Sequence, residues 1–265
     1  MSVQIYAETD PGLQRAHNED SVAFDVPSGL CILADGMGGH KAGEVASGMA
    51  SAFLKSELRE WVNQSGRSAS RAEVRMAVER AIAQANSAIY NMSKSSARYS
   101  GMGTTLVTGL FHENALVLAH IGDSRCYRLR GEQLEQLTKD HSVHQEQVDA
   151  GLRGAGPASR EQKLVTRALG VDERAEIDVE TLETAPGDIY LMCSDGLSDM
   201  VENGAIAAIL RNSGNIAQRV KHLVNAANAA GGRDNISVLI AEVDAPREPG
   251  LLNAARRMLS SVWSG

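Results

Sequence analysis

Short apolar runs that end in an aspartate are the feature of this sequence that most limits how it can fold. They occur at Leu33-Ala34-Asp35-Gly36, Ile121-Gly122-Asp123-Ser124 and Cys193-Ser194-Asp195-Gly196, and Arg233-Asp234-Asn235 stands directly before another apolar run. A strand end supports its carboxylate rigidly, and a following glycine allows a sharp turn. One such turn is ordinary loop chemistry. Several meeting at one rim would form an all-oxygen site, which suits Mg²⁺ or Mn²⁺ better than zinc.

The apolar runs have the length and composition of β-strands. Nine of them are bounded by Gly, Asp or Asn. They are Val3–Ala7, Ser21–Val26, Leu30–Ala34, Thr105–Phe111, Ala115–Ile121, Arg125–Leu129, Ile177–Leu182, Asp188–Cys193 and Ile236–Val243.

Helical periodicity replaces the strand pattern in two parts of the chain. Between Gly43 and Met92 it predicts two amphipathic helices separated by the polar stretch Asn63–Ser70. A second pair is predicted at Ala205–Leu210 and Ile216–Ala230, the latter ended by two glycines. Runs of strands interrupted by helix pairs favour an α+β domain with antiparallel sheets.

Composition narrows the classes of protein that this chain can belong to. Its 265 residues are 43% hydrophobic, enough for a buried core. The net charge of -7 argues against nucleic-acid binding and against an anionic membrane surface. No apolar stretch approaches the roughly 18 residues of a membrane span, and the N-terminus lacks a signal-peptide pattern, so we expect a cytoplasmic protein. The three cysteines, Cys31, Cys126 and Cys193, lie in apolar contexts and are predicted to be reduced core thiols.

Two segments stand apart from the periodic pattern. Leu152–Lys163 is rich in Gly, Ala and charge and is predicted to be a surface loop or flap, within a flap region of about residues 140–170. After a main domain at 1–244, the stretch 245–265 is predicted to be a breaker-rich linker and an amphipathic tail. Such a tail could bind a partner or a membrane surface, or pack on its own domain.

The acidic turns occur with other short motifs, in an order that matches a known family over nearly the whole chain. These motifs are Thr9-Asp10-Pro11-Gly12, Arg15, Asn18-Glu19-Asp20, Ala34-Asp35-Gly36-Met37-Gly38-Gly39-His40, Gly101-Met102-Gly103-Thr104-Thr105, Gly122-Asp123-Ser124-Arg125, Thr138-Lys139-Asp140-His141-Ser142, Thr166-Arg167-Ala168-Leu169-Gly170, Ser194-Asp195-Gly196-Leu197-Ser198-Asp199 and Gly232-Arg233-Asp234-Asn235. With them the chain resembles the PP2C-like (PPM) metal-dependent protein serine/threonine phosphatases, in their compact bacterial branch.

The resemblance implies a fold and a set of site residues. The fold would be a four-layer α-β-β-α sandwich, with two antiparallel sheets packed face to face and flanked by helix pairs. Two Mn²⁺ or Mg²⁺ ions would be bound, and a third at a weaker site. The implied ligands of the first two ions are Asp35, Gly36, Asp195 and Asp234, and Glu19 and Asp20 would act largely through water. Asp123 and Asp199, with Asp195, would hold the third ion. Arg15 would bind the phosphate.

The implied reaction is hydrolysis of phosphoserine and phosphothreonine by attack of a metal-bridging hydroxide. Met37 stands where eukaryotic relatives have a histidine proposed as the general acid, and a thioether cannot donate a proton. The proton would then come from metal-bound water, or from His40 if it reaches the site. The implied partners are phosphorylated proteins, including a Ser/Thr kinase and its substrates, and the protein is expected to be a monomer.

Other phosphatase and nucleotide-binding classes lack their signatures here. A cysteine phosphatase needs Cys-x5-Arg, but the residues at that spacing are Met37, Glu132 and Asp199. There is no Gly-x4-Gly-Lys-Ser/Thr loop. Two alternatives on the same scaffold stay open, a regulatory module with an inactive site and a small-molecule phosphatase.

Overall fold

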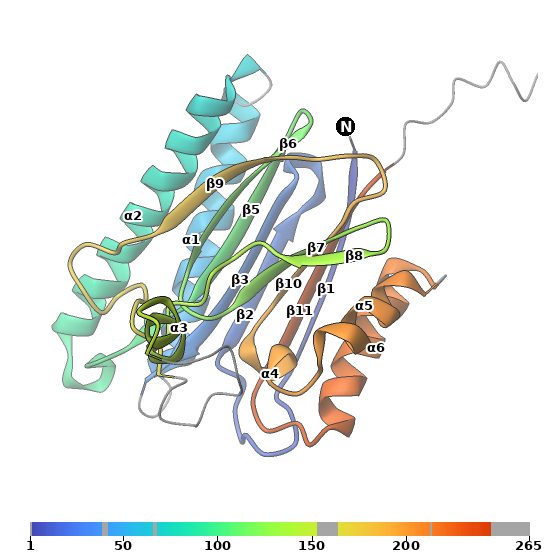
Figure 1. Cartoon of the computed structure of the whole chain (residues 1–265). Helices are drawn as coiled ribbons and strands as arrows, with labels where there is room; N and C mark the ends of the chain where they lie inside the picture. Colours follow the sequence, from blue (N-terminus) through green and yellow to red (C-terminus); the bar gives the residue numbers. More distant parts are fainter. Residues whose placement is uncertain (1, 39–41, 66–67, 153–163, 213, 245–265) are drawn as a thin grey trace, which may run out of the picture.

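The computed structural model describes residues 2–38, 42–65, 68–152, 164–212 and 214–244. Within these residues the strands form two antiparallel sheets (Figure 1). The first sheet has the order β1 (Val3–Asp10), β11 (Ile236–Val243), β10 (Ile189–Cys193), β7 (Arg125–Arg130), β8 (Gln133–Gln136). The second has the order β2 (Asp20–Asp25), β3 (Leu30–Met37), β5 (Leu106–His112), β6 (Ala115–Ile121), β9 (Asp178–Glu183), and the short β4 (Gly103–Thr104) pairs with the end of β3.

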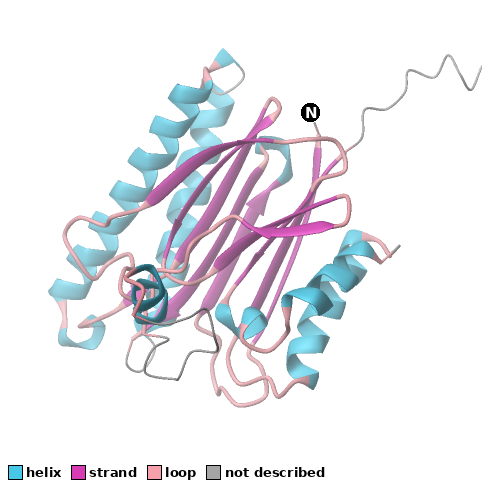
Figure 2. Cartoon of the chain, in the orientation of Figure 1, coloured by secondary structure: helices cyan, strands magenta, loops and turns pink. Residues whose placement is uncertain are grey.

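Helices cover the outer face of each sheet (Figure 2). The long helices α1 (Ala42–Gln64) and α2 (Arg71–Ser95) pack on the second sheet. The first sheet is covered by α5 (Asn203–Arg211) and α6 (Ile216–Ala229). The remaining helices are short: η1 (Val26–Ser28), η3 (Ala97–Tyr99), α3 (Val143–Asp149) and α4 (Asp195–Ser198). The predicted α+β fold and its four α-β-β-α layers are confirmed.

Alternation along the strands divides the core into three apolar layers. In β3, Leu30, Ile32 and Ala34 pack against the helices, whereas Cys31 and Leu33 point into the space between the sheets. Successive side chains of a strand face opposite ways, so one apolar run supplies two layers. The three cysteines are buried and unpaired, as predicted, and are part of these layers.

The sequence predicted the central elements well and the short ones poorly. All nine predicted strands and both helix pairs are present within a few residues of the expected bounds, whereas β4, β8, α3 and α4 were not predicted. Helix α3 occupies part of the predicted flap region, and its start is capped by Ser142, whose Oγ accepts from Gln145 N at 3.3 Å. Residues 153–163 of the flap and the predicted linker and tail 245–265 lie outside the described residues.

Two of the predicted Asp-Gly turns have a different local structure. Asp35 and Gly36 do not follow β3 but lie within it, because Gly36 and Met37 pair with Thr104 and Gly103 of β4. Asp195 begins the helix α4 rather than a turn. In both cases the backbone that carries the carboxylate is fixed by regular hydrogen bonding, which is a firmer support than a turn.

Candidate active site

Four aspartates converge at one edge of the sandwich, at which β2 and β11 begin and β3 and β10 end. Asp20 begins β2 and lies opposite Asp35 in the antiparallel register with β3. Asp195 follows β10, and Asp234 precedes β11 in the other sheet. The predicted rim therefore exists, and residues up to 214 positions apart in the sequence (Asp20 to Asp234) meet there.

The backbone of Asp35 is fixed on two sides. Its N–H donates to Thr105 Oγ1 at 3.0 Å, and its carbonyl accepts from Thr105 N at 2.8 Å and Thr104 Oγ1 at 2.9 Å. Thr105 Oγ1 also contacts Ser124 Oγ at 2.8 Å, which links Asp35 to the turn that carries Asp123. A site that must hold its ligands within a fraction of an ångström requires such support.

Glycine is required at Gly36 because the neighbouring backbones approach closely. A Cβ there would lie 2.2 Å from Gly43 O and 2.5 Å from Glu19 O. Gly36 N also donates to Glu19 O at 3.1 Å, so the start of α1, the end of β3 and Glu19 pack around this residue. The same holds at Gly196, where a Cβ would lie 2.0 Å from Asn235 O.

Two positioning residues were not singled out from the sequence. Asn235 Oδ1 accepts from Glu19 N at 2.8 Å, and its Nδ2 donates to Pro11 O and His17 O, which fixes the segment that carries Arg15. Ser194 Oγ donates to Asp20 Oδ2 at 2.8 Å and accepts from Ser237 N at 2.9 Å. Each is a buried polar residue adjacent to a predicted aspartate, and that adjacency was the available signal.

Three of the four edge carboxylates, those of Asp20, Asp35 and Asp195, are crowded and lack basic partners, whereas Asp234 pairs with Arg15. Within the described residues no Lys or Arg is ion-paired with Asp20, Asp35 or Asp195. Burial, and then the charges of Asp20 and Asp195, raise the pKa of Asp35 well above its usual range. Burial raises the pKa of Asp20 to about 6, and one of its oxygens, Oδ1, is buried with no hydrogen-bond partner. An orphaned buried oxygen among repelling carboxylates fits a bound cation.

These donors fit hard cations such as Mg²⁺ or Mn²⁺. The aspartate oxygens do not form a tight trio: in the described part of the chain, the trio with ligand atoms all within 4.8 Å of one another is His120, His141 and Asp178. A magnesium-like ion needs no such trio, since it keeps several waters and one or two carboxylates.

The predicted third-ion residues meet in a separate small cavity of about 50 Å³. It is lined by Asp123, Arg125, Asp140, Ser142, His144, Asp195, Ser198 and Asp199. Burial, followed by the charge of Asp140, raises the pKa of Asp123 to about 7. Asp140 itself is held by the guanidinium of Arg125 through contacts of 2.9 and 2.6 Å. The structure thus brings Asp123, Asp195 and Asp199 together.

Arg15 lies at the mouth of the site. Its Nη2 donates to Asp234 Oδ2 at 2.6 Å, and this bond raises the pKa of Arg15, whose side chain is 53% exposed. Met37 ends β3, and His40 lies outside the described residues.

Comparison with known proteins places the chain among phosphatases. Residues 14–237 match the family model described as Protein phosphatase 2C. The serine/threonine phosphatase stp of Listeria monocytogenes is 36% identical over 241 residues, covering 89% of this chain and 94% of that protein. The crystal structure of the Mycobacterium tuberculosis serine/threonine phosphatase PstP/Ppp superposes with a TM-score of 0.84 at 37% identity, over 92% of this chain and 100% of that one. A PstP catalytic domain in complex with two manganese ions gives a TM-score of 0.79 at 38% identity, over 92% and 99%.

Proposed function

This chain belongs to the protein phosphatase 2C family, and we propose that it is a Mn²⁺- or Mg²⁺-dependent hydrolase of phosphoserine and phosphothreonine in proteins. The observation that carries the proposal is the group of crowded aspartates at one sandwich edge, Asp20, Asp35 and Asp195, which have no basic partner among the described residues and whose pKa values are raised by burial and by one another's charges. The manganese ions of the related PstP catalytic domain support the same view.

We assign each acidic residue a role in holding the ions. Asp35 would serve two ions, Asp195 and Asp234 would complete one site, and the Gly36 carbonyl would contribute to the other. Glu19 and Asp20 act largely through water, and the buried position of Asp20 behind Ser194 agrees with an indirect role. Asp123 and Asp199, with Asp195, would hold a third and weaker ion in the cavity that they line.

The ions supply Lewis-acid activation of a water and positive charge opposite the phosphoryl oxygens. The protein's own residues position the phosphate. Arg15 has five N–H donors in a planar fork, so it can bind phosphoryl oxygens while it keeps its bond to Asp234. Asn235 holds the Arg15 segment in place through Pro11 O and His17 O. Met37 cannot protonate the leaving group, so the leaving alkoxide takes its proton from water or from His40.

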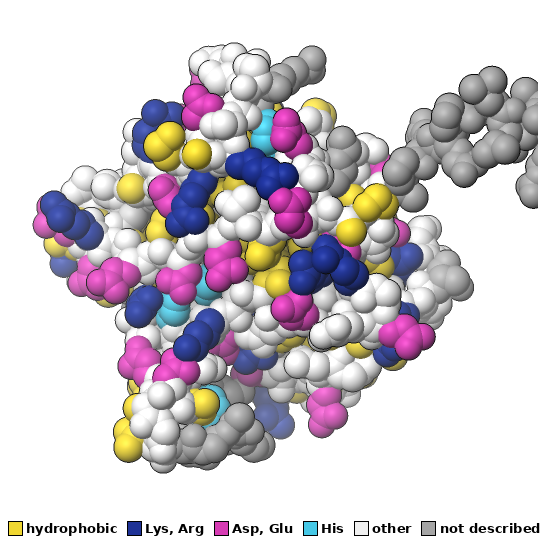
Figure 3. Space-filling model, turned by 45° about the horizontal axis from the view of Figure 1, so that its top comes forward, with side chains coloured by type: hydrophobic (Ala, Val, Ile, Leu, Met, Phe, Trp, Pro, Cys, Tyr) yellow, Lys and Arg dark blue, Asp and Glu magenta, His cyan; other side chains and the backbone are white. Residues whose placement is uncertain are grey.

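The proposed substrates are phosphorylated proteins, and the proposed opposing enzyme is a bacterial Ser/Thr kinase of the eukaryotic-like kind. We further propose a monomeric, cytoplasmic protein with its phosphatase domain at 1–244. Among the described helices, none has the length and apolar character required to cross a bilayer. On the face in Figure 3 basic and acidic side chains are interspersed, so a phosphoprotein there would meet charges of both signs.

The experiment that tests the function compares two substrates under controlled metal. Purified protein is stripped with chelator and assayed on p-nitrophenyl phosphate and on a phosphothreonine peptide, with and without Mn²⁺ or Mg²⁺. We expect turnover of both substrates only with added metal. Full turnover in excess chelator would refute the metal mechanism. Turnover of p-nitrophenyl phosphate alone would indicate a small-molecule phosphatase, and no turnover of either would indicate an inactive regulatory module.

A further inference from the structure

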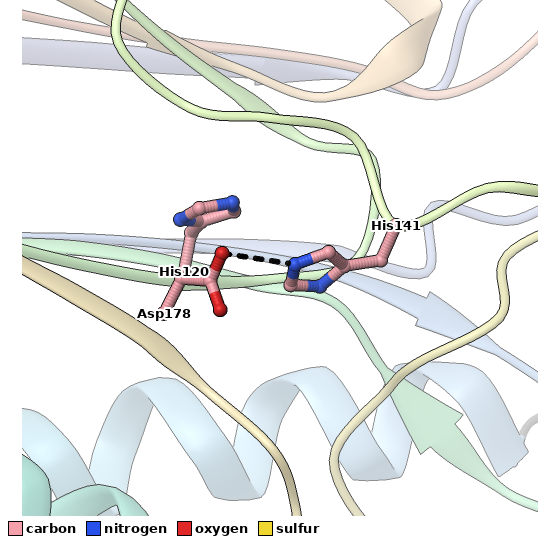
Figure 4. A group of neighbouring side chains, drawn as sticks. All are labelled: His120, His141 and Asp178. Carbon is pink, nitrogen blue, oxygen red and sulfur yellow. Dashed lines mark ion pairs between the residues drawn. The ribbon is translucent and has the colours of Figure 1, made fainter. Parts of the chain in front are cut away.

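A second cluster of titratable side chains lies beside the aspartate edge and has no role in the proposed reaction. It contains His120 from β6, His141 before α3 and Asp178 at the start of β9 (Figure 4). The two imidazole rings are stacked, with centroids 4.9 Å apart and an interplanar angle of 20°. His141 is buried, and its Nε2 faces Asp178 Oδ2 at 3.5 Å.

Two histidines and a carboxylate suggest a transition-metal site, but their geometry does not support one. An imidazole lone pair lies in the plane of its ring, so stacked rings do not direct their nitrogens to one point. Gly122 N–H donates to His141 Nδ1 at 3.2 Å, which requires a lone pair on Nδ1 and, in a neutral ring, the proton on Nε2. Arg167 Nη1 already lies 3.7 Å from Asp178 Oδ1 and supplies positive charge there.

The neutral ring is the form that this environment favours. Burial, and then the proximity of His120 and Arg167, lower the pKa of His141. A neutral imidazole with Nδ1 accepting from Gly122 turns its Nε2–H toward the carboxylate of Asp178, at a distance of 3.5 Å that is longer than a hydrogen bond. A carboxylate beside one ring nitrogen selects the tautomer that the other nitrogen needs.

His141 holds the turn that carries Asp123 through both backbone groups of Gly122. Besides the bond to Nδ1, His141 N donates to Gly122 O at 2.9 Å. Gly122 has a φ of 100°, and a Cβ there would lie 2.6 Å from Thr105 Cγ2, so the turn has an unusual conformation in a tight space. His120 Nε2 contacts Lys139 O at 2.9 Å, which ties the His141 segment to β6 a second time.

We propose that His141 is the positioning residue of the third-ion site of Asp123, Asp195 and Asp199, called the outer cation site below. In its Nε2–H tautomer, which Asp178 selects, His141 fixes the Gly122–Asp123 turn. The role given to Asp123 rests on the proposed function, whereas the tautomer of His141 does not, so the two can fail separately. Losing such a support around a metal ligand typically weakens metal binding about 10- to 100-fold.

The first experiment uses the unaltered, metal-free protein. Long-range ¹H–¹⁵N spectra at pH 7.5 report the tautomer of each histidine, and we expect His141 to be neutral with its proton on Nε2. A proton on Nδ1 or a charged ring would overturn the proposal. So would stoichiometric binding of Zn²⁺ that His120→Ala abolishes, because the cluster would then be a metal site.

The second experiment separates positioning from packing. Mn²⁺ binding is followed by electron paramagnetic resonance without substrate, so the result does not depend on activity. Asn places an acceptor near Nδ1 and Gln places one near Nε2, so His141→Asn should keep the weakest site within about threefold, whereas His141→Gln and His141→Ala should weaken it at least about tenfold. Asp178→Asn, which keeps an acceptor, is the matched control and should resemble the parent.

The two inner sites, those assigned to Asp35, Gly36, Asp195 and Asp234, show whether replacing His141 weakens only the outer cation site. We expect their Mn²⁺ affinity to change by less than about twofold in every folded variant, since none of their ligands lies on the Gly122–Asp123 turn that His141 holds. Equal weakening of all sites, failure of His141→Asn to restore the weakest site, or absence of a third site in the parent would each overturn the proposal. If His141→Ala does not fold, the proposal is still tested by the tautomer of His141 and by the variants His141→Asn and His141→Gln.

Discussion

Strand β10 has an aspartate next to each of its ends, and the protein treats the two in opposite ways. Asp188 precedes the strand with a side chain only 1% exposed. Arg130 donates to both of its oxygens at 2.7 Å, and Ala185 N and Tyr190 OH add bonds of 2.8 and 3.1 Å. Burial alone would raise the pKa of Asp188, but these donors bring it below its usual range.

Asp195 follows the other end of β10, and no such set of donors surrounds its carboxylate among the residues that the structure describes. Burial, and then the charges of Asp123, Asp234 and Asp199, raise its pKa well above the usual range. The contrast teaches how to separate structural from functional carboxylates. A buried carboxylate whose bonds are complete within the protein stabilises the fold, whereas one left among like charges needs a partner from outside.

The largest expected effect comes from Asp195→Asn. Removing this carboxylate should lower kcat/KM on the phosphothreonine peptide by at least about 10³-fold, which corresponds to about 4 kcal/mol of lost transition-state stabilisation. Because like-charge repulsion is relieved, the metal-free protein should unfold at the same or a higher temperature. Steady-state kinetics and a thermal melt check both parts. An Asp195→Asn variant that keeps a tenth of the activity, or melts at a clearly lower temperature, would contradict the contrast drawn between Asp188 and Asp195.

Asp188→Asn tests the opposite end of the strand. The amide cannot form the charged pair with Arg130, and losing hydrogen bonds to a charged group costs about 1.5 to 3 kcal/mol. We therefore expect the free energy of unfolding in urea to fall by roughly this amount, while kcat of the folded protein stays within about twofold. The Asp195→Asn protein is the matched control. Lost activity with unchanged stability would show that Asp188 belongs to the site.

The sequence predicted the strands and the site aspartates because both leave local signals. An apolar run such as Ala115–Ile121 is read directly as a strand, and its observed bounds are identical. The ordered motifs around Asp35, Asp195 and Asp234 identified the rim, because a motif is recognised from neighbouring residues and from its order along the chain rather than from contacts between distant residues.

The parts that were missed depend on contacts between distant residues. Strand β4 has two residues and exists because Gly103 and Thr104 pair with the end of β3. Asn235 binds Glu19, which is 216 positions away in sequence. The clamp of His141 on Gly122 spans 19 positions and depends on the tautomer of the ring, which no pattern of residue types records.

The smallest expected effect is the pH dependence of the metal-free protein, and it tests the comparison without any mutation. The pKa of Asp20 is raised to about 6 and that of Asp123 to about 7, so between roughly pH 4 and pH 7 the folded chain binds more protons than the unfolded chain. Stability must then fall as the pH rises through this window. We therefore expect the chelator-treated parent protein to melt at a higher temperature at pH 5.5, within this window, than at pH 7.5, above it, by on the order of 5 °C. Asp188, with its lowered pKa, acts in the opposite direction only below about pH 4, outside this range. His141, whose pKa is also lowered, opposes the trend within the range, but as one group against at least two carboxylates. Saturating Mn²⁺ should reverse the trend, because ions compete with protons for the same oxygens and bind more tightly as the carboxylates ionise. A melting temperature that rises with pH in the absence of metal would show that the edge carboxylates are already compensated within the protein.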